Sequence, residues 1–249
     1  MILQDRPNPI GELLIVLEYW DHIFSGFLLT MWLYGWALLM GFFLGLILAN
    51  LRQYGGWFLS RIASGYVEFI RGTPLLAQLF FIYFLPSSLN IPVGDWKIET
   101  SFTILNKDIT IILLNYRTLA GLLALGLNSA AYQAEYFRGA IMSVGTEQLM
   151  AAQSLGMSRI AGIRHIVLPQ ALRRVIPAWS NEAAYLPKYT VVVYFIGVKD
   201  LFSQAHHVVA FTFISLTTYI LIAIIFIVTI TLISKGLDIL HKKTMIPGL

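Results

Sequence analysis

Two ionisable residues, Glu182 and Lys188, stand alone in the otherwise uncharged stretch from Val175 to Val198. An ionisable group inside a long apolar segment usually faces a polar cavity or a partner and marks a functional site. Glu182 could accept a charge-assisted hydrogen bond from a ligand ammonium group, or it could pair structurally with Lys188 or with an arginine of another helix. Six residues span about 240° around an α-helix, so a straight helix would keep the two charges apart. Pro177 and Pro187 indicate that this helix is not straight.

Two further charged pairs have helical spacing. Glu68 precedes Arg71 by three positions, and Glu135 precedes Arg138 by three positions. Residues three apart lie on the same face of a helix, so each pair can form an ion pair. We interpret all four residues as structural ion pairs that hold helix ends.

A basic segment from Glu147 to Arg174 separates two apolar stretches. Its first part, Glu147 to Leu155, consists of good helix formers and predicts a short helix. Ala151, Ala152 and Leu155 are spaced to lie on one face of that helix.

A glycine marks the end of this predicted helix. Gly156 suits the position after a helix C-terminus, and Ser158 can cap a second short helix. Pro169 then interrupts the pattern. The apolar face of the second helix would consist of Ile160, Ile163 and Val167. Two short helices that meet at a glycine predict a compact, ordered element and not a flexible loop.

The residue types argue against covalent catalysis in this chain. It has no cysteine and no GxxxxGK[ST] phosphate loop, so any ATP hydrolysis linked to it must take place in another chain. The neighbouring histidines His206 and His207 would point in different directions on a helix, which argues against a shared metal site. We expect no metal and no cofactor in the chain itself.

The elements that position these residues are predicted to be membrane helices. The chain has 249 residues, of which 57% are hydrophobic and only 12% are charged, about half the charged fraction of a soluble domain. Five apolar stretches, three of them uncharged and longer than the roughly 20 residues that cross a bilayer as a helix, predict an all-α protein with five spans. They run from His22 to Leu51, Gly72 to Gly94, Thr118 to Ala134, Val175 to Val198 and Leu201 to Ser234.

The distribution of lysine and arginine predicts the orientation of these spans. With the N-terminus outside and the C-terminus inside, eleven of the seventeen cationic residues fall on the cytoplasmic side and five fall outside. The net positive charge is therefore interpreted as membrane topology and not as nucleic-acid binding. The N-terminus lacks the basic region of a cleavable signal peptide.

The predicted organisation follows from these spans. Residues 1–21 form an external segment with a short interfacial helix, and residues 22–241 form the membrane domain. Within it, an external loop at 87–117 has the alternation of a β-hairpin, and a cytoplasmic loop at 142–174 joins spans three and four. Residues 242–249 form a cytoplasmic tail.

The stretch "AAQSLGMSRIAGIRHIVLP" resembles the cytoplasmic coupling loop of ABC importer permeases. That family's pattern is Glu-Ala-Ala, three residues, Gly, nine residues, Ile, any residue, Leu-Pro. The family positions are occupied here by Ala151, Ala152, Gly156, Ile166, Leu168 and Pro169. Met150 replaces the family's acidic residue. The resemblance implies that this loop, with Leu155, docks on a cytoplasmic ATPase; an amphipathic helix pair lying on the inner membrane surface is the alternative.

Three other stretches resemble the permeases for histidine, arginine, glutamine and glutamate: "YVEFIRGTPLLAQLFFIYF", "NSAAYQAEYFRGAI" and "PAWSNEAAYLPKYT". The resemblance implies that Asn181 and Glu182 contribute to a substrate pocket beside Lys188. Family members that take cationic amino acids tend to carry an acid after the lysine, where this chain has Tyr189. This departure leaves the substrate open, and it also leaves open whether the chain contacts substrate directly.

The resemblance implies a type I ABC importer permease in a prokaryotic plasma or inner membrane. Its partners would be two ATPase subunits that bind ATP and magnesium, a second permease chain of the same or different sequence, an external substrate-binding protein and a polar amino acid. The alternatives are a permease for an opine or a sulfur amino acid and, less favoured, an ion-coupled carrier.

Overall fold

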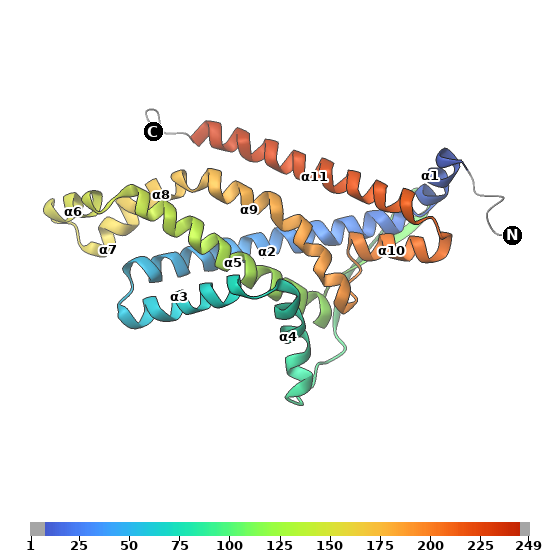
Figure 1. Ribbon diagram of the computed structural model, residues 1–249, viewed down its shortest axis with the longest axis horizontal. Coiled ribbons are helices and arrows are strands. Elements are labelled where there is room, and N and C mark those ends of the chain that lie inside the picture. The colour runs from blue at the N-terminus through green and yellow to red at the C-terminus, as the bar shows by residue number, and fades with distance from the viewer. Residues whose placement is uncertain (1–7, 245–249) are drawn as a thin grey trace. The chain divides into compact units, whose positions relative to one another are not determined.

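The computed structural model describes residues 8–244 of the chain (Figure 1). The described elements are mostly helical, and a two-stranded antiparallel sheet lies between α4 and α5. In chain order they are α1 (Pro9–Glu18), α2 (Trp20–Tyr54), α3 (Trp57–Gly72), α4 (Leu75–Ser88), β1 (Lys97–Ile104), β2 (Lys107–Asn115), α5 (Tyr116–Val144), α6 (Thr146–Ser154), α7 (Arg159–Gly162), a π-helical turn η1 (Ile163–Val167), α8 (Leu168–Arg174), α9 (Ile176–Tyr189), a 3-10 helix η2 (Thr190–Ile196), α10 (Leu201–Thr212) and α11 (Ser215–Thr244).

Long apolar helices identify a membrane protein. Among the described residues, α2 and α11 are each long and apolar enough to cross a bilayer, and α3 with α4 would make a third crossing if the bent pair counts as one span. α5 is a 29-residue helix that contains the predicted third span.

Three of the predicted spans are not single α-helices, which corrects the expectation from uncharged length alone. The second, Gly72 to Gly94, holds only the 14-residue helix α4, which begins after the extended Thr73 and Pro74 and ends at Ser88. The fourth passes from α9 into the 3-10 helix η2. The fifth is split between α10 and α11, where Phe213 adopts a positive φ of 57°.

The predicted ends of the chain are also refined. Residues 8–21 of the predicted external segment hold α1 and the start of α2, and Asn8 caps α1 by accepting a hydrogen bond from the Gly11 amide. Residues 1–7 lie outside the described part. α11 continues to Thr244, so the predicted tail begins within a helix, and its residues 245–249 are likewise outside the described part.

The predicted hairpin is confirmed. β1 and β2 pair from Lys97 with Asn115 to Ile104 with Lys107. Leu105 and Asn106 form the two-residue turn with φ of 50° and 60°. Positive φ at both turn residues gives a turn whose twist matches that of the paired strands.

The described residues form two compact units, and each has its own core. The first comprises residues 8–36, 76–125 and 187–230; there α1, α10 and the start of α11 pack around Val16, Leu201 and Val208. The second comprises residues 37–75, 126–186 and 231–244; there Phe137 and Val167 are central to a core of α2, α5 and α8.

Two glycines set how closely α2 and α5 approach in the second unit. A Cβ atom at Gly41 would lie 2.3 Å from the Nε2 atom of Gln133, and one at Gly45 would lie 3.0 Å from the Ala130 carbonyl oxygen. Both distances are shorter than a van der Waals contact. The GxxxG pair therefore brings Gln133 against the backbone of α2, which matters for the site below.

Candidate functional site

The side chain of Glu182 lies inside the second unit. It is 4% exposed, and its Oε1 atom accepts a hydrogen bond of 2.8 Å from the Ser129 hydroxyl of α5. Among the described residues of this unit, no cationic side chain forms an ion pair with Glu182. A carboxylate can accept about four hydrogen bonds, so Glu182 keeps acceptor capacity for a ligand that carries an ammonium group.

A chain of hydrogen bonds fixes the Ser129 hydroxyl. Gln133, which is fully buried, donates from Nε2 to Ser129 at 3.0 Å and to the Leu38 carbonyl at 3.2 Å. Its Oε1 atom accepts from the Trp179 indole at 2.7 Å. Because Ser129 accepts from Gln133, its own hydrogen is directed to Glu182. Groups on α2, α5 and α9 therefore act together to orient the Glu182 carboxylate.

The other predicted pathway residues differ from Glu182 in exposure. Asn181 is exposed on α9, one position before Glu182 and therefore turned about 100° away from it. Lys188 and Tyr189 are exposed at the end of α9, within the first unit. Of the four predicted pathway residues, Glu182 is the buried one.

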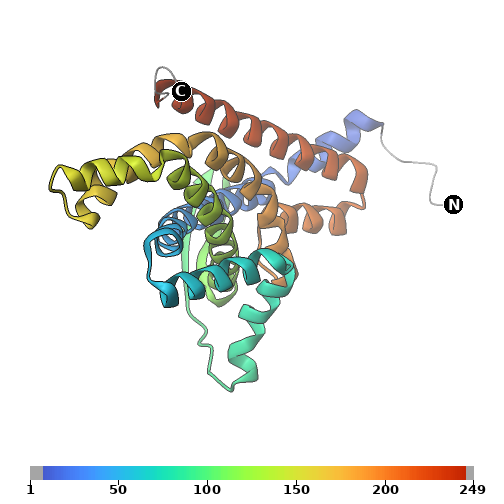
Figure 2. The same cartoon turned by 60° about the vertical axis from the view of Figure 1, so that its left-hand side comes forward.

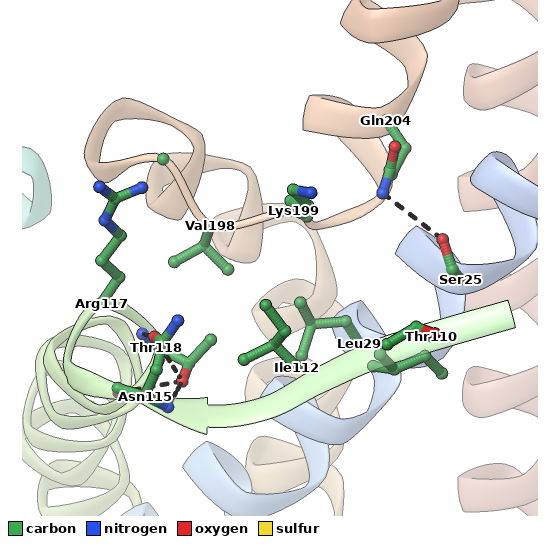
Figure 3. Close-up of a pocket in the computed structure, with 12 residues that line it drawn as sticks. Ser25, Leu29, Thr110, Ile112, Asn115, Arg117, Thr118, Val198, Lys199 and Gln204 are labelled. Atoms are coloured by element: carbon green, nitrogen blue, oxygen red, sulfur yellow. Dashed lines mark hydrogen bonds between the residues drawn. The ribbon is translucent and has the colours of Figure 1, made fainter. Parts of the chain in front are cut away.

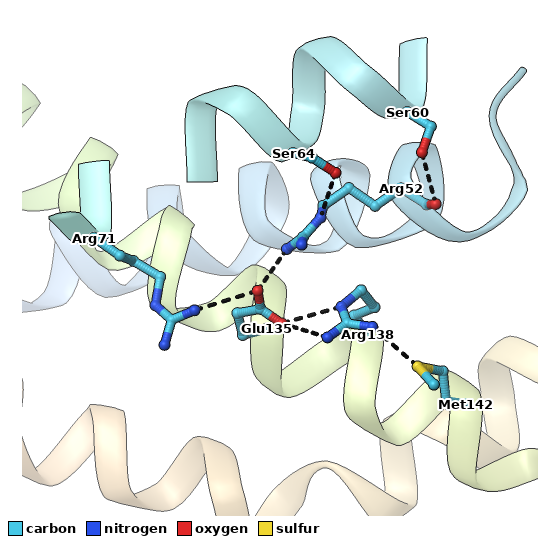
Figure 4. A network of polar contacts seen from close by, with 7 residues as sticks. All are labelled: Arg52, Ser60, Ser64, Arg71, Glu135, Arg138 and Met142. Carbon is cyan, nitrogen blue, oxygen red and sulfur yellow. Dashed lines mark hydrogen bonds and ion pairs between the residues drawn. The ribbon is translucent and has the colours of Figure 1, made fainter. Parts of the chain in front are cut away.

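Glu135 is the centre of a second polar cluster in the same unit (Figure 4). Its carboxylate contacts Arg52 at 2.7 Å, Arg71 at 3.2 Å and Arg138 at 2.9 Å. Arg52, which is 10% exposed, also donates to the Ser64 hydroxyl at 3.1 Å. One carboxylate thus ties α2, α3 and α5 together through three guanidinium groups.

This cluster confirms one predicted ion pair and corrects the other. Arg138 pairs with Glu135 at the predicted spacing. Arg71 is three residues from Glu68, but its guanidinium contacts Glu135 and lies 5.3 Å from the ring centroid of Tyr132. Glu68 is exposed and makes no ion pair among the described residues. Glu135 is the stronger partner because it is less exposed to water, which therefore screens the attraction less.

The basic segment after α5 forms the predicted helical elbow, defined here as α6, α7 and the turn between them. Gly156 has a φ of +85° directly after the C-cap of α6, a conformation that favours glycine. Ser158 caps α7 by accepting from the Ala161 amide at 3.2 Å. Figure 2 shows α6 and α7 folded back on each other beyond the ends of α5 and α8. Gly162 permits this because a Cβ there would lie 2.8 Å from Leu149 of α6.

Three large apolar side chains of the elbow are exposed among polar neighbours. Met150 and Leu155 are 56% and 86% exposed, and Ile160 is 78% exposed. Of the predicted apolar face of the second helix, Val167 is buried, Ile163 is half-buried and Ile160 is exposed.

The remaining predicted coupling residues differ in their surroundings. Ala151 is exposed beside Met150, whereas Ala152 is buried under α7. Ile166 is half-buried in the π-helical turn, and its carbonyl accepts from Gln170 at 2.9 Å. Pro169 stands in the first turn of α8, so it begins a helix and does not interrupt one.

Sequence reasoning missed Ser129, Gln133 and Trp179, which position Glu182, and Arg52, which pairs with Glu135. The signal was present for two of them: Ser129 and Gln133 are polar residues four apart within an otherwise apolar stretch, and therefore share one helix face. Arg52 gives no comparable signal, since 83 residues separate it from its partner.

Comparison with known proteins connects these features to a transport family. Residues 41–245 match the family model described as binding-protein-dependent transport system inner membrane component. The chain is 32% identical to the glutamine transport system permease protein GlnP of Escherichia coli (strain K12) over 90% of its own length and 93% of that protein. It is 30% identical to the arginine ABC transporter permease protein ArtM of Haemophilus influenzae, over 92% of this chain and 94% of the relative.

A solved structure resembles the chain along nearly its whole length. The crystal structure of an amino acid ABC transporter with histidines superposes with a TM-score of 0.78 at 30% identity, and covers 96% of this chain and 100% of the other. An inward-facing MetNI methionine ABC transporter matches with a TM-score of 0.60 at 17% identity, which supports the fold alone. The chain belongs to the family of inner membrane components of binding-protein-dependent transport systems.

Proposed function

We propose that this chain is the permease subunit of an ATP-driven importer for polar amino acids. The helical elbow is the observation that carries the proposal. Its exposed apolar residues Met150, Leu155 and Ile160 project from a turn that Gly156, Ser158 and Gly162 hold rigid. A rigid apolar projection at the end of long helices suits docking to a second protein, because a force applied there moves the helices as a body.

The proposed assembly contains two permease chains, two cytoplasmic ATPases and an external substrate-binding protein. ATP and magnesium bind the ATPases, and the permease catalyses no covalent step. The proposed topology has five crossings with the N-terminus outside, and it puts the elbow and most of the cationic residues on the cytoplasmic side. Closure of the ATPases would then move the elbow and open the pathway alternately to the two sides of the membrane.

Glu182 is the proposed contact for the substrate ammonium group. It is buried and held by Ser129 with acceptor capacity left over. Asn181, Lys188 and Tyr189 are proposed to line the same pathway on the evidence of the family motif. The polar amino acids named for similar permeases all carry an α-ammonium group, so the proposal does not depend on which one is transported.

An opine importer is a second candidate. The chain is 29% identical to the nopaline transport system permease protein NocM of Agrobacterium fabrum, over 90% of its own length. Competition of nopaline and octopine with glutamine, arginine and histidine in the same uptake assay separates the two candidates.

The test uses the chain assembled with its ATPase, its second permease chain and its binding protein in proteoliposomes. The assay measures uptake of labelled glutamine, arginine and histidine together with ATP hydrolysis. In Gly156→Val a branched side chain is forced into a positive φ, so we expect at least about a tenfold loss of uptake per ATP hydrolysed. Gly156→Asn is the matched control, because asparagine tolerates this conformation and should keep coupling within about twofold. Equal coupling in both variants would refute the role of the elbow.

A further inference from the structure

A cavity of about 190 Å³ lies within the first unit (Figure 3). It is bounded by β2, the start of α5, the start of α10 and the outer part of α2. Water occupies about 30 Å³ per molecule in the liquid, so the cavity has room for about six waters or for one small organic molecule. It is separate from Glu182, which belongs to the second unit.

Two cationic side chains line this cavity. Arg117, at the first turn of α5, and Lys199, before α10, are both exposed. Neither forms an ion pair with a carboxylate among residues 8–244, and the lining holds no acidic residue. Other external cations do have partners: Lys97 pairs with Glu99 at 2.9 Å and Lys107 with Asp21 at 2.6 Å. The cavity is therefore an uncompensated positive site.

Asp200 is adjacent in sequence to Lys199, but its carboxylate serves the helix. It accepts from the amides of Ser203 at 2.9 Å and Phe202 at 3.4 Å as the N-cap of α10. Burial raises the pKa of Asp200 to about 7, although these amide hydrogen bonds act in the opposite direction. Asp200 is not among the residues that line the cavity.

Neutral polar groups extend the site at both ends. Asn115 and Thr118 hold each other beside Arg117, through Thr118 N to Asn115 Oδ1 at 2.8 Å and Asn115 N to Thr118 Oγ1 at 2.6 Å. At the other end, Figure 3 shows Gln204 joined to Ser25 by a hydrogen bond of 3.5 Å, which is long for such a bond. The Nδ2 atom of Asn115 donates no hydrogen bond within residues 8–244, so it can donate to a ligand in the cavity.

The wall between the two ends is apolar. Leu29, Ile111, Ile112 and Val198 face the cavity between its polar ends. An apolar wall offers nothing to replace the hydration of a small inorganic anion, whereas it packs well against an aliphatic chain. The preferred ligand is therefore an organic carboxylate with a short aliphatic part.

We propose that this cavity is an entry site that binds the α-carboxylate of an incoming amino acid between Arg117 and Lys199 before the amino acid reaches the pathway. Arg117 and Asn115 hold the carboxylate, and the apolar wall receives the aliphatic part of the side chain. This inference rests on the proposed import function. It adds a second site, which recognises the carboxylate, to the one at Glu182, which recognises the ammonium group.

The test measures binding of labelled glutamine to the purified permease–ATPase complex in the absence of the binding protein. Butyrate and butyramide are the competitors, since they share an aliphatic chain and differ in charge. We expect Arg117→Met and Lys199→Met each to weaken binding about tenfold or more, as loss of a hydrogen bond to a charged group does. Arg117→Lys, which keeps the charge, should retain an intermediate affinity. Butyrate should compete and butyramide should not. Lys97→Met, which removes an external cation that lies outside this cavity, is the control and should bind like the unaltered complex.

Unchanged glutamine binding in both methionine variants would overturn the entry site. If half-maximal ATP hydrolysis in these variants also required a higher binding-protein concentration, Arg117 and Lys199 would contact the binding protein instead. If the unaltered complex imports amino acids in either case, only the entry site is refuted. If the unaltered complex neither binds nor imports any amino acid, the proposed function fails as well.

Discussion

Glu135 and Glu182 are two carboxylates of the same compact unit with opposite surroundings. Glu135 contacts three guanidinium groups at 2.7 to 3.2 Å, whereas the recorded partner of Glu182 is one hydroxyl at 2.8 Å. Glu182 is also the more buried of the two. A carboxylate surrounded by cations has no capacity left for a ligand, while a buried carboxylate with one neutral partner has capacity and a strong preference for a cation. We therefore assign a structural role to Glu135 and a functional role to Glu182.

The largest effect is expected at Glu182. Glu182→Gln keeps a hydrogen-bond partner for Ser129 but removes the negative charge. Loss of one partner of a buried charge pair costs about 2–5 kcal/mol, so uptake by proteoliposomes should fall at least about thirtyfold. The unfolding temperature in detergent should remain the same or rise, because an unpaired buried carboxylate does not stabilise the fold. Uptake within twofold of the unaltered complex would remove Glu182 from the pathway.

The next effect is a loss of stability at Glu135. Glu135→Gln leaves Arg52, Arg71 and Arg138 close together without a counter-charge. Breaking a buried ion pair costs about 3–5 kcal/mol, and the partial exposure of this cluster reduces our expectation to about 2–3 kcal/mol. Thermal unfolding of the assembled complex measures it. Arg71→Met is the matched control, since Arg71 is the most exposed of the three arginines and should cost about 1 kcal/mol or less. If both variants unfold alike, the cluster does not hold the helices together.

A smaller effect is expected at Gln133, which links the network around Glu182. Gln133→Met fills similar volume but leaves the Trp179 indole without its acceptor, at a cost of about 1–2 kcal/mol. Uptake should fall as well, because the Ser129 hydroxyl can then turn away from Glu182. Trp179→Phe removes the indole donor and part of the packed ring, so it should cost at least as much stability with less loss of uptake. Equal losses of uptake would show that Gln133 supports the fold and does not orient Ser129.

The parts of the fold that were predicted correctly are those specified by adjacent residues. Gly156 and Ser158 marked a helix end and a helix start within three positions, and both hold in the structure. The hairpin followed from the alternation within the loop at 87–117. Such signals act through local backbone preferences, so they do not depend on the rest of the fold.

The parts that were missed depend on contacts distant in sequence or on breaks without a marker residue. The break between α10 and α11 falls at Phe213 and Ile214, and neither position holds a glycine or proline that would indicate a helix end. The partners of Glu135 lie on three helices, and only Arg138 is near it in sequence. Burial of Glu182 was predicted from its apolar neighbours, but the hydroxyl that holds it belongs to α5, 53 residues away.

The smallest effect separates the two accounts of Arg71. The helical spacing assigned Arg71 to Glu68, whereas the structure assigns it to Glu135. Because Glu68 is exposed and forms no ion pair among residues 8–244, Glu68→Gln should change the free energy of unfolding by less than about 0.5 kcal/mol. The Glu68→Gln/Glu135→Gln double variant should then be no less stable than Glu135→Gln alone, since the two sites do not interact. If Glu68→Gln lost as much unfolding free energy as Glu135→Gln, Arg71 would pair with Glu68 and not with Glu135. Glu135 would then have fewer cationic partners, and its difference from Glu182 would be smaller.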